Sequence, residues 1–191
     1  MSLIPEFELG LWNAWILVIP MLISFFFAER VSADRESGKS GDFQLTRTEK
    51  GVINAVLLIL FVSLVYAVFL PLQLGTAWLY GGLLVYLFGM VVIVSAVLNF
   101  ASSPKGKVIT RRLYGASRNP MYLGLLLLQI GVGIACSSWL YLLLTVVLMI
   151  LLNVNSSAEE RYCLYRYGDD YRRYMNSTPR WIGIPKSQKK D

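Results

Sequence analysis

The sequence predicts an all-α membrane protein with about five transmembrane helices, the last two forming a helical hairpin, followed by short cytoplasmic C-terminal helices. Of its 191 residues, 55% are hydrophobic and only 16% are charged, whereas about 25% of residues are charged in a soluble domain. No charged residue lies between Lys50 and Lys105 or between Arg118 and Glu159. Uncharged apolar stretches of this length are typical of bilayer-spanning helices. We therefore expect residues 1–191 to form a single integral membrane domain.

The first three spans are expected at residues 9–28, 52–70 and 77–100. Residues 9–28 carry no charge and would form a helix of about 30 Å, which matches the hydrocarbon core of a bilayer. No basic segment precedes this run and no small-residue cleavage site follows it, so we expect a retained helix rather than a signal peptide. Pro71 and Gly75 separate the second span from the third.

The last two spans are expected at residues 121–135 and 139–152. The uncharged run that contains them would be about 50 Å long as one helix, which is too long for a single crossing. The chain must therefore turn back, and Cys136, Ser137 and Ser138 are the expected turn.

The basic residues predict the orientation of these spans. All 18 Lys and Arg residues fall in three segments, 29–50, 102–118 and 154–191. Five crossings place the three segments on one face, which the positive-inside rule makes cytoplasmic, with the N-terminus outside and the C-terminus inside. Four crossings would place the basic C-terminal segment on the wrong side. Loop orientation also accounts for the net charge of +6 without a nucleic-acid partner.

The residue types that are missing restrict the chemistry. The chain contains no histidine, and its two cysteines, Cys136 and Cys163, do not form a CxxC motif. These absences argue against a metal site and against histidine-based acid–base catalysis. Any reaction must then depend on carboxylates, arginine, tyrosine, amides or a cofactor.

Two polar features of the fourth span have structural and functional interpretations. Asn119 fits a helix N-cap and Pro120 the first helical position, while Arg118 beside a helix N-terminus could bind an anionic group such as a carboxylate. The capping interpretation is favoured for these residues. For Gln129, within the span, a hydrogen bond between helices is favoured over a ligand contact.

The segment after the fifth span contains an acidic pair. Glu159 and Glu160 each follow a serine by three residues, as in a capping box, which is the structural interpretation of both. Because the pair lies on the basic side of the membrane, we also expect it to pair with arginines of segment 102–118, either structurally or within a functional site.

Tyrosines follow at a helical spacing. Gly168 is a natural helix C-cap, and a short helix is expected from Asp169. Tyr167, Tyr171 and Tyr174 then share one face. An interfacial belt or a packing face is the favoured interpretation of this stripe.

Taken in order, the stretch from Arg118 to Gly124, a hydrophobic hairpin, the acidic pair and the tyrosine stripe resemble the isoprenylcysteine carboxyl methyltransferase family, a broad group that includes the phospholipid N-methyltransferases. The resemblance covers residues 105–185. Two positions depart from the family pattern. Asn119 replaces a usual histidine, and Arg112-Leu113 replaces a Gly-Pro pair that commonly precedes Tyr114.

The resemblance implies a methyltransferase that uses S-adenosyl-L-methionine in a bacterial inner membrane. The cofactor would bind at the cytoplasmic face, and a lipid or small hydrophobic acceptor would arrive from the bilayer. The donor is already activated, so the protein has mainly to position it and exclude water. The implied catalytic residues are Arg118, Glu159 and Glu160, and the implied cofactor-binding residues are Asn119, Pro120, Tyr122, Gly124, Tyr167, Tyr171 and Tyr174.

Other functions remain open at this point. The same clusters would serve a non-enzymatic membrane scaffold or partner subunit. A third possibility is an oxidoreductase related to the membrane sterol reductases, which share a similar C-terminal pattern but are longer proteins. A transporter is disfavoured because the spans carry no charge and no inverted repeat. A carboxylate or thiolate acceptor would need no base, whereas an ammonium acceptor would first have to lose a proton.

Overall fold

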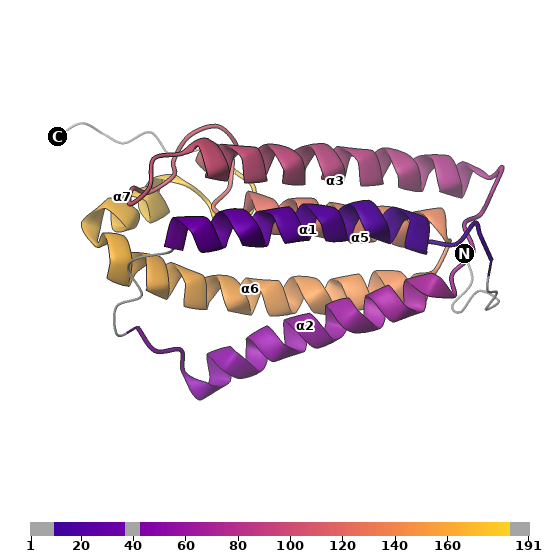
Figure 1. The fold of residues 1–191 in the computed structure, drawn as a ribbon, viewed down its shortest axis with the longest axis horizontal. Coiled ribbons are helices and arrows are strands. Elements are labelled where there is room, and N and C mark those ends of the chain that lie inside the picture. Colours follow the sequence, from indigo (N-terminus) through magenta and orange to yellow (C-terminus); the bar gives the residue numbers. More distant parts are fainter. Residues whose placement is uncertain (1–9, 37–42, 184–191) are drawn as a thin grey trace.

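A computed structural model describes residues 10–36 and 43–183, and in these residues the chain is helical with no strand (Figure 1). The all-α prediction is confirmed. The helices, in order, are α1 (Trp15–Glu36), α2 (Arg47–Val68), α3 (Ala77–Ser102), α4 (Leu113–Ala116), α5 (Pro120–Ala135), α6 (Trp139–Tyr167) and α7 (Asp169–Ser177).

The long helices are those of an integral, multi-pass membrane protein. Four of the described helices, α1, α2, α3 and α6, are long and apolar enough to cross a membrane. Helix α5 is apolar but has only 16 residues, about 24 Å at the usual rise. Four long helices and this shorter arm are consistent with about five crossings.

All the helices reach a common end of the bundle, the α7 end, where α7 packs (Figure 1). Helices α1, α3 and α6 finish there, and α2 and α5 begin there. The described basic residues of the three predicted segments therefore gather at this end. The described residues at the opposite end, 10–14, 69–76 and 136–138, include no charged residue.

At this opposite end, backbone pairing replaces the first turns of the predicted first span. Helix α1 begins at Trp15 rather than near residue 9 because the chain before it pairs with the connection after α2. The Ala14 N–H donates to the Leu70 carbonyl at 2.9 Å, and the Asn13 side-chain amide donates to the Val68 carbonyl at 2.8 Å. Polar backbone groups are thereby satisfied where the helices end.

Glycines bring α3 and α5 into close contact. Gly82 and Gly89 on α3 face Gly131 and Gly124 on α5, with a spacing of seven residues on each helix. A β-carbon on Gly82 would lie 2.3 Å from the backbone nitrogen of Ala135. Small residues allow this approach in membrane helices. The contact fixes α5, and with it the start of α5 at the α7 end.

The hairpin turn and the buried side-chain amide of Gln129 are as predicted from the sequence. The chain turns at residues 136–138, where the Ser138 hydroxyl accepts a hydrogen bond from the Tyr141 N–H at 3.3 Å. The Tyr141 hydroxyl donates to Oε1 of Gln129 at 2.5 Å and so links α6 to α5. The structural interpretation of Gln129 is confirmed.

The capping-box interpretation of the acidic pair is wrong. Helix α6 runs without a break from Trp139 to Tyr167, so no helix begins at Ser156. The Ser156 hydroxyl instead donates to the Leu152 carbonyl one turn earlier, at 2.9 Å. Gly168 ends α6 with a φ of 57°, and α7 begins at Asp169, as predicted.

Candidate active site

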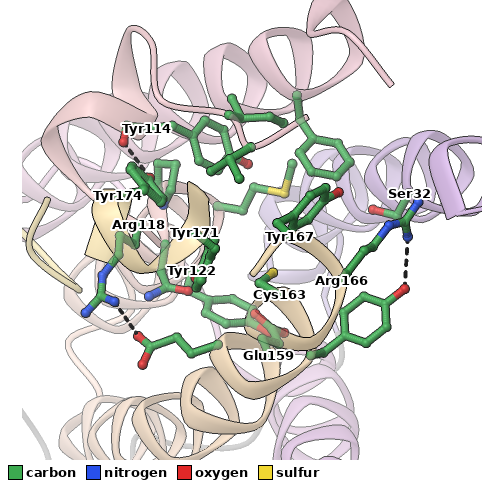
Figure 2. A pocket seen from close by; sticks show the side chains of 18 of the residues that line it. Ser32, Tyr114, Arg118, Tyr122, Glu159, Cys163, Arg166, Tyr167, Tyr171 and Tyr174 are labelled. Atoms are coloured by element: carbon green, nitrogen blue, oxygen red, sulfur yellow. Dashed lines mark hydrogen bonds and ion pairs between the residues drawn. The ribbon is translucent and has the colours of Figure 1, made fainter. Parts of the chain in front are cut away.

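A cavity of about 390 Å³ lies at the α7 end of the bundle (Figure 2). Its walls come from α1, α3, residues 106–109, α4, the start of α5, the end of α6 and α7. This volume falls within the range of small-molecule sites, about 300–1,000 Å³. The fold thus brings segments that are far apart in the sequence together around one partly open cavity.

Nine of the ten residues implied by the resemblance line this cavity. They are Arg118, Asn119, Pro120, Tyr122, Glu159, Glu160, Tyr167, Tyr171 and Tyr174. Gly124 is not among the described lining residues: a β-carbon there would lie 2.8 Å from the backbone nitrogen of Ile93 on α3. Gly124 therefore lies in the contact between α3 and α5.

Two arginines surround the buried carboxylate of Glu160. Arg180 donates from Nε to Oε1 at 2.9 Å and from Nη2 to Oε2 at 2.6 Å, and these hydrogen bonds raise the pKa of Arg180. Nη1 of Arg118 forms an ion pair with Oε1 at 3.3 Å. The expected pairing with segment 102–118 is thus present, and Arg180 adds a second, bidentate partner.

Arg118 has hydrogen-bonding capacity left over. Its Nε and Nη1 atoms are buried and have no hydrogen-bond partner among the described residues. Nη1 is close enough to Glu160 for charge attraction but is not aligned for a hydrogen bond. Because a buried guanidinium N–H without an acceptor is costly, the site favours a further anionic or polar group beside Arg118.

The loop before α5 is tied to the segment after α7. The Arg118 N–H donates to the Pro179 carbonyl at 3.0 Å, and the Asn119 side-chain amide donates to the Arg180 carbonyl at 3.1 Å. Asn119 occupies the N-cap position of α5 but makes no side-chain cap bond. Its amide therefore closes the site on one side instead of capping the helix.

Glu159 lies one position before Glu160 but has different partners. Its Oε1 accepts hydrogen bonds from the Tyr122 hydroxyl and, at 3.1 Å, from Nδ2 of Asn155. The same Nδ2 donates to the Tyr122 hydroxyl oxygen at 2.8 Å. The three residues form a closed hydrogen-bonded group between α5 and α6.

The tyrosines of α7 form a packing face over the cavity. The Tyr174 hydroxyl donates to the Tyr114 carbonyl at 2.5 Å, and its ring contacts that of Tyr171 with centroids 5.7 Å apart. Burial raises the pKa of both phenols, so they stay protonated at physiological pH and cannot act as bases. The packing interpretation of this part of the stripe is confirmed.

The cavity also has an apolar side. Phe25 and Ala28 of α1, Ile93 and Phe100 of α3, and Met121 of α5 line it there. Of these helices, α1 and α3 carry the exposed apolar surfaces expected in a bilayer. The polar groups of Arg118 and the acidic pair thus share one space with apolar walls.

Two residues of this network, Arg180 and Asn155, are not among the site residues predicted from the sequence. Arg180 follows the tyrosine stripe in the sequence Pro-Arg-Trp, which could have marked a cation returning to the acidic pair. Asn155 lies four residues before Glu159, one turn along α6 and on the same face.

The fold and this cavity define an integral membrane protein with a cavity of small-molecule size at one end of its helix bundle. Among the described residues, no group of three or more His, Cys, Asp or Glu could hold a metal ion. A family model described as phospholipid methyltransferase matches residues 77–170, from the start of α3 to the start of α7. The match places this region in a family of membrane methyltransferases, and methyltransferase activity in general is what that family implies. No curated protein and no solved structure gives a significant match to the chain.

Proposed function

We propose that this protein transfers a methyl group from S-adenosyl-L-methionine to a lipophilic acceptor at the cytoplasmic face of the membrane, by an isoprenylcysteine carboxyl methyltransferase-like reaction. The family match supports methyl transfer in general. The observation that carries the cofactor assignment is the buried guanidinium of Arg118, which borders the cavity with two N–H groups unsatisfied.

The residues present fit this cofactor. Its amino-acid end carries a carboxylate, and either the Nε or the Nη1 atom of Arg118 can donate a charge-assisted hydrogen bond to a carboxylate oxygen. Arg180 keeps the Glu160 charge compensated, so Arg118 can turn toward a ligand without leaving that carboxylate unpaired. The tyrosines that line the cavity would cover the aromatic part of the ligand.

When bound, the cofactor supplies a methyl group that is already activated on a sulfonium. The work left to the protein is to hold the two reactants in line and to keep water out. Tyr171 and Tyr174 close the cavity from α7, and the hydrogen bonds from Arg118 and Asn119 to residues 179–180 keep the chain closed beside it. A carboxylate or thiolate acceptor would react there without a base.

The apolar walls support a lipid or small hydrophobic acceptor. Phe25 and Ala28 of α1 contribute to the cavity, so an acceptor could extend toward the bilayer from the polar end. The distribution of Lys and Arg supports an arrangement in which the α7 end is cytoplasmic and the N-terminus lies outside, in a bacterial inner membrane.

Isothermal titration of the detergent-purified protein with S-adenosylhomocysteine tests the cofactor assignment. We expect the wild type to bind, and Arg118→Ala to lose at least about tenfold in affinity, because a charged hydrogen bond typically contributes 1.5–3 kcal/mol. Arg173→Ala is the matched control, since Arg173 is an exposed arginine that pairs with Asp170 on α7. A folded wild-type protein that binds no ligand at millimolar concentration would contradict the proposal and favour a scaffold role.

A further inference from the structure

A short segment after α7, residues 178–183, is bonded both to the start of α5 and to α6, and we call it the strap. The side-chain amide of Asn119, at the start of α5, donates to the Arg180 carbonyl at 3.1 Å. On the other side, the Trp181 indole donates to Oδ1 of Asn153 on α6 at 3.0 Å. These hydrogen bonds hold the strap between the two helices of the hairpin.

The strap brings a second arginine to a carboxylate that already has one. The side chains of Glu160 and Arg118 are 9% and 11% exposed, and that of Arg180 is 29% exposed. Two guanidinium groups and one carboxylate leave one positive charge uncompensated within this group. Because a buried charge is costly without a counter-charge, the group attracts a further anion.

The two arginines hold Glu160 unequally. Arg180 donates to both carboxylate oxygens, from Nε and Nη2, whereas Arg118 approaches only Oε1, at 3.3 Å and without an aligned hydrogen bond. The planar, bidentate geometry is the stronger of the two. Arg180 therefore satisfies the carboxylate, and Arg118 keeps the N–H groups of Nε and Nη1 for further acceptors.

Undocking of the strap would change this division. Glu160 would lose its bidentate partner, and Arg118 is close enough to take the place of Arg180. Since a buried carboxylate without a partner is costly, Arg118 would turn to Glu160 and away from a ligand. Coupling between two binding events is reciprocal, so a ligand that holds Arg118 would in turn favour the docked strap.

We propose that Arg180 is a positioning residue for the methyl donor: it holds Glu160 and so leaves Arg118 for the donor carboxylate, which makes docking of the strap and binding of the donor favour each other. The inference rests on the proposed function, because the ligand carboxylate is that of S-adenosyl-L-methionine. Asn119 contributes to the same coupling, since it holds the Arg180 carbonyl.

Two ligands that differ only in a carboxylate test whether Arg180 keeps Arg118 available. S-adenosylhomocysteine carries the carboxylate and its decarboxylated analogue lacks it, so the ratio of the two dissociation constants measures carboxylate recognition. We expect the wild type to favour S-adenosylhomocysteine, and Arg118→Ala and Arg180→Ala each to reduce this preference about tenfold. Arg180 itself is not among the described residues that line the cavity. Partial unfolding cannot mimic the effect, because both ligands are measured on the same variant.

A double variant separates competition for Arg118 from damage to the site. Glutamine is neutral and does not attract a guanidinium by charge, so Arg180→Ala combined with Glu160→Gln should recover the wild-type preference to within about threefold. Arg161→Ala is the matched control and should keep the preference. Arg161 forms another bidentate pair, with Glu49 of α2, and neither residue is among the described residues that line the cavity.

Tryptic cleavage after Arg180 measures docking of the strap. The protease must take this side chain out of its pair with Glu160, so the cleavage rate follows the undocked fraction. We expect saturating S-adenosylhomocysteine to slow cleavage at least about threefold more than the saturating decarboxylated analogue, and the two ligands to act equally in Arg118→Ala. Cleavage after Arg47, which is exposed at the start of α2, should not respond to either ligand.

The inference fails, and the proposed function stands, if the wild type shows no carboxylate preference or if Arg180→Ala keeps it. It also fails if the double variant does not recover the preference, or if both ligands slow cleavage of the wild type equally. A wild type that binds neither adenosyl ligand overturns the proposed function together with the inference.

Discussion

Arg118 and Arg180 both form ion pairs with the Glu160 carboxylate. Arg118 precedes α5, and Arg180 follows α7, so this carboxylate joins two segments separated by the whole hairpin. Removing the carboxylate would leave two guanidinium groups facing each other. Glu160 therefore stabilises the fold by holding two arginines from distant segments.

This role predicts unequal stability of two neighbouring variants. We expect Glu160→Gln to destabilise the fold by about 2–3 kcal/mol, below the range for breaking a fully buried ion pair because Arg180 is partly exposed. Glu159→Gln should cost less, at most about 1 kcal/mol, because the glutamine amide oxygen can still accept hydrogen bonds from the Tyr122 hydroxyl and the Asn155 amide. Thermal unfolding in detergent measures both, and equal losses would contradict the assignment of the ion pair to Glu160.

Arg112 carries backbone strain next to the site. Its φ is 55° with ψ at −126°, a region that favours glycine, and the resembling family commonly has a Gly-Pro pair where this chain has Arg112-Leu113. The departure from the pattern therefore falls where a glycine is conformationally preferred.

We expect Arg112→Gly to stabilise the protein by about 1 kcal/mol, since relief of such strain outweighs the greater backbone entropy of glycine. Thermal unfolding would show a raised midpoint. Arg111→Gly is the control and should not stabilise, because Arg111 is not among the described residues with positive φ. A lowered midpoint for Arg112→Gly would contradict this expectation, since it would show that the arginine side chain stabilises the fold by more than the strained backbone destabilises it.

Among the helices, α3 and α5 depend most directly on small residues. Gly82 faces the backbone of α5, whereas its neighbour Gly81 faces open space. We expect Gly82→Ala to destabilise the fold by about 1–3 kcal/mol through overpacking, and Gly81→Ala to be neutral or slightly stabilising. The two variants differ only in the face of α3 that they alter. Equal thermal midpoints would contradict the close contact.

Hydrophobicity predicts the existence of the helices well and their ends poorly. The charge-free runs and the turn at residues 136–138 match the described helices because a bilayer dictates both length and composition. The end of α6 was missed because its last turns, from residue 153 to Tyr167, are polar and lie beyond the apolar run. The serines before the acidic pair looked like caps, but an unbroken helix needs none there.

The candidate site could be predicted in part. Arg118 and Tyr122, which line the cavity, were predicted because the ordered motifs resemble a family pattern, not from their position beside a span. Arg180 and Asn155 were missed, since their contacts depend on how α7 folds back and on the rotation of α6. Gly124 was grouped with the site by its place in a motif, although three-dimensionally it faces α3.

For the whole molecule, the number of crossings decides which positions share a compartment. Leu74 lies between α2 and α3 and is exposed, and Arg173 lies on α7 and is also exposed. Three crossings separate them if α5 and α6 each span the bilayer. We expect a membrane-impermeant maleimide to label Leu74→Cys in intact cells, and Arg173→Cys only after permeabilisation. Cys136 and Cys163 are replaced by serine in both, and labelling of the two sites from the same side would contradict five crossings.

The continuity of α6 has a consequence for how the protein fits bilayers of different thickness. At 29 residues, this helix is a rod of about 43 Å, with the turn of the hairpin at one end and Glu159 and Glu160 near the other. A rod of fixed length cannot adapt to a thicker or thinner bilayer except by tilting or by sinking. Acyl-chain length would thereby set the depth at which the cavity meets the headgroups, and so the reach of any acceptor embedded among them.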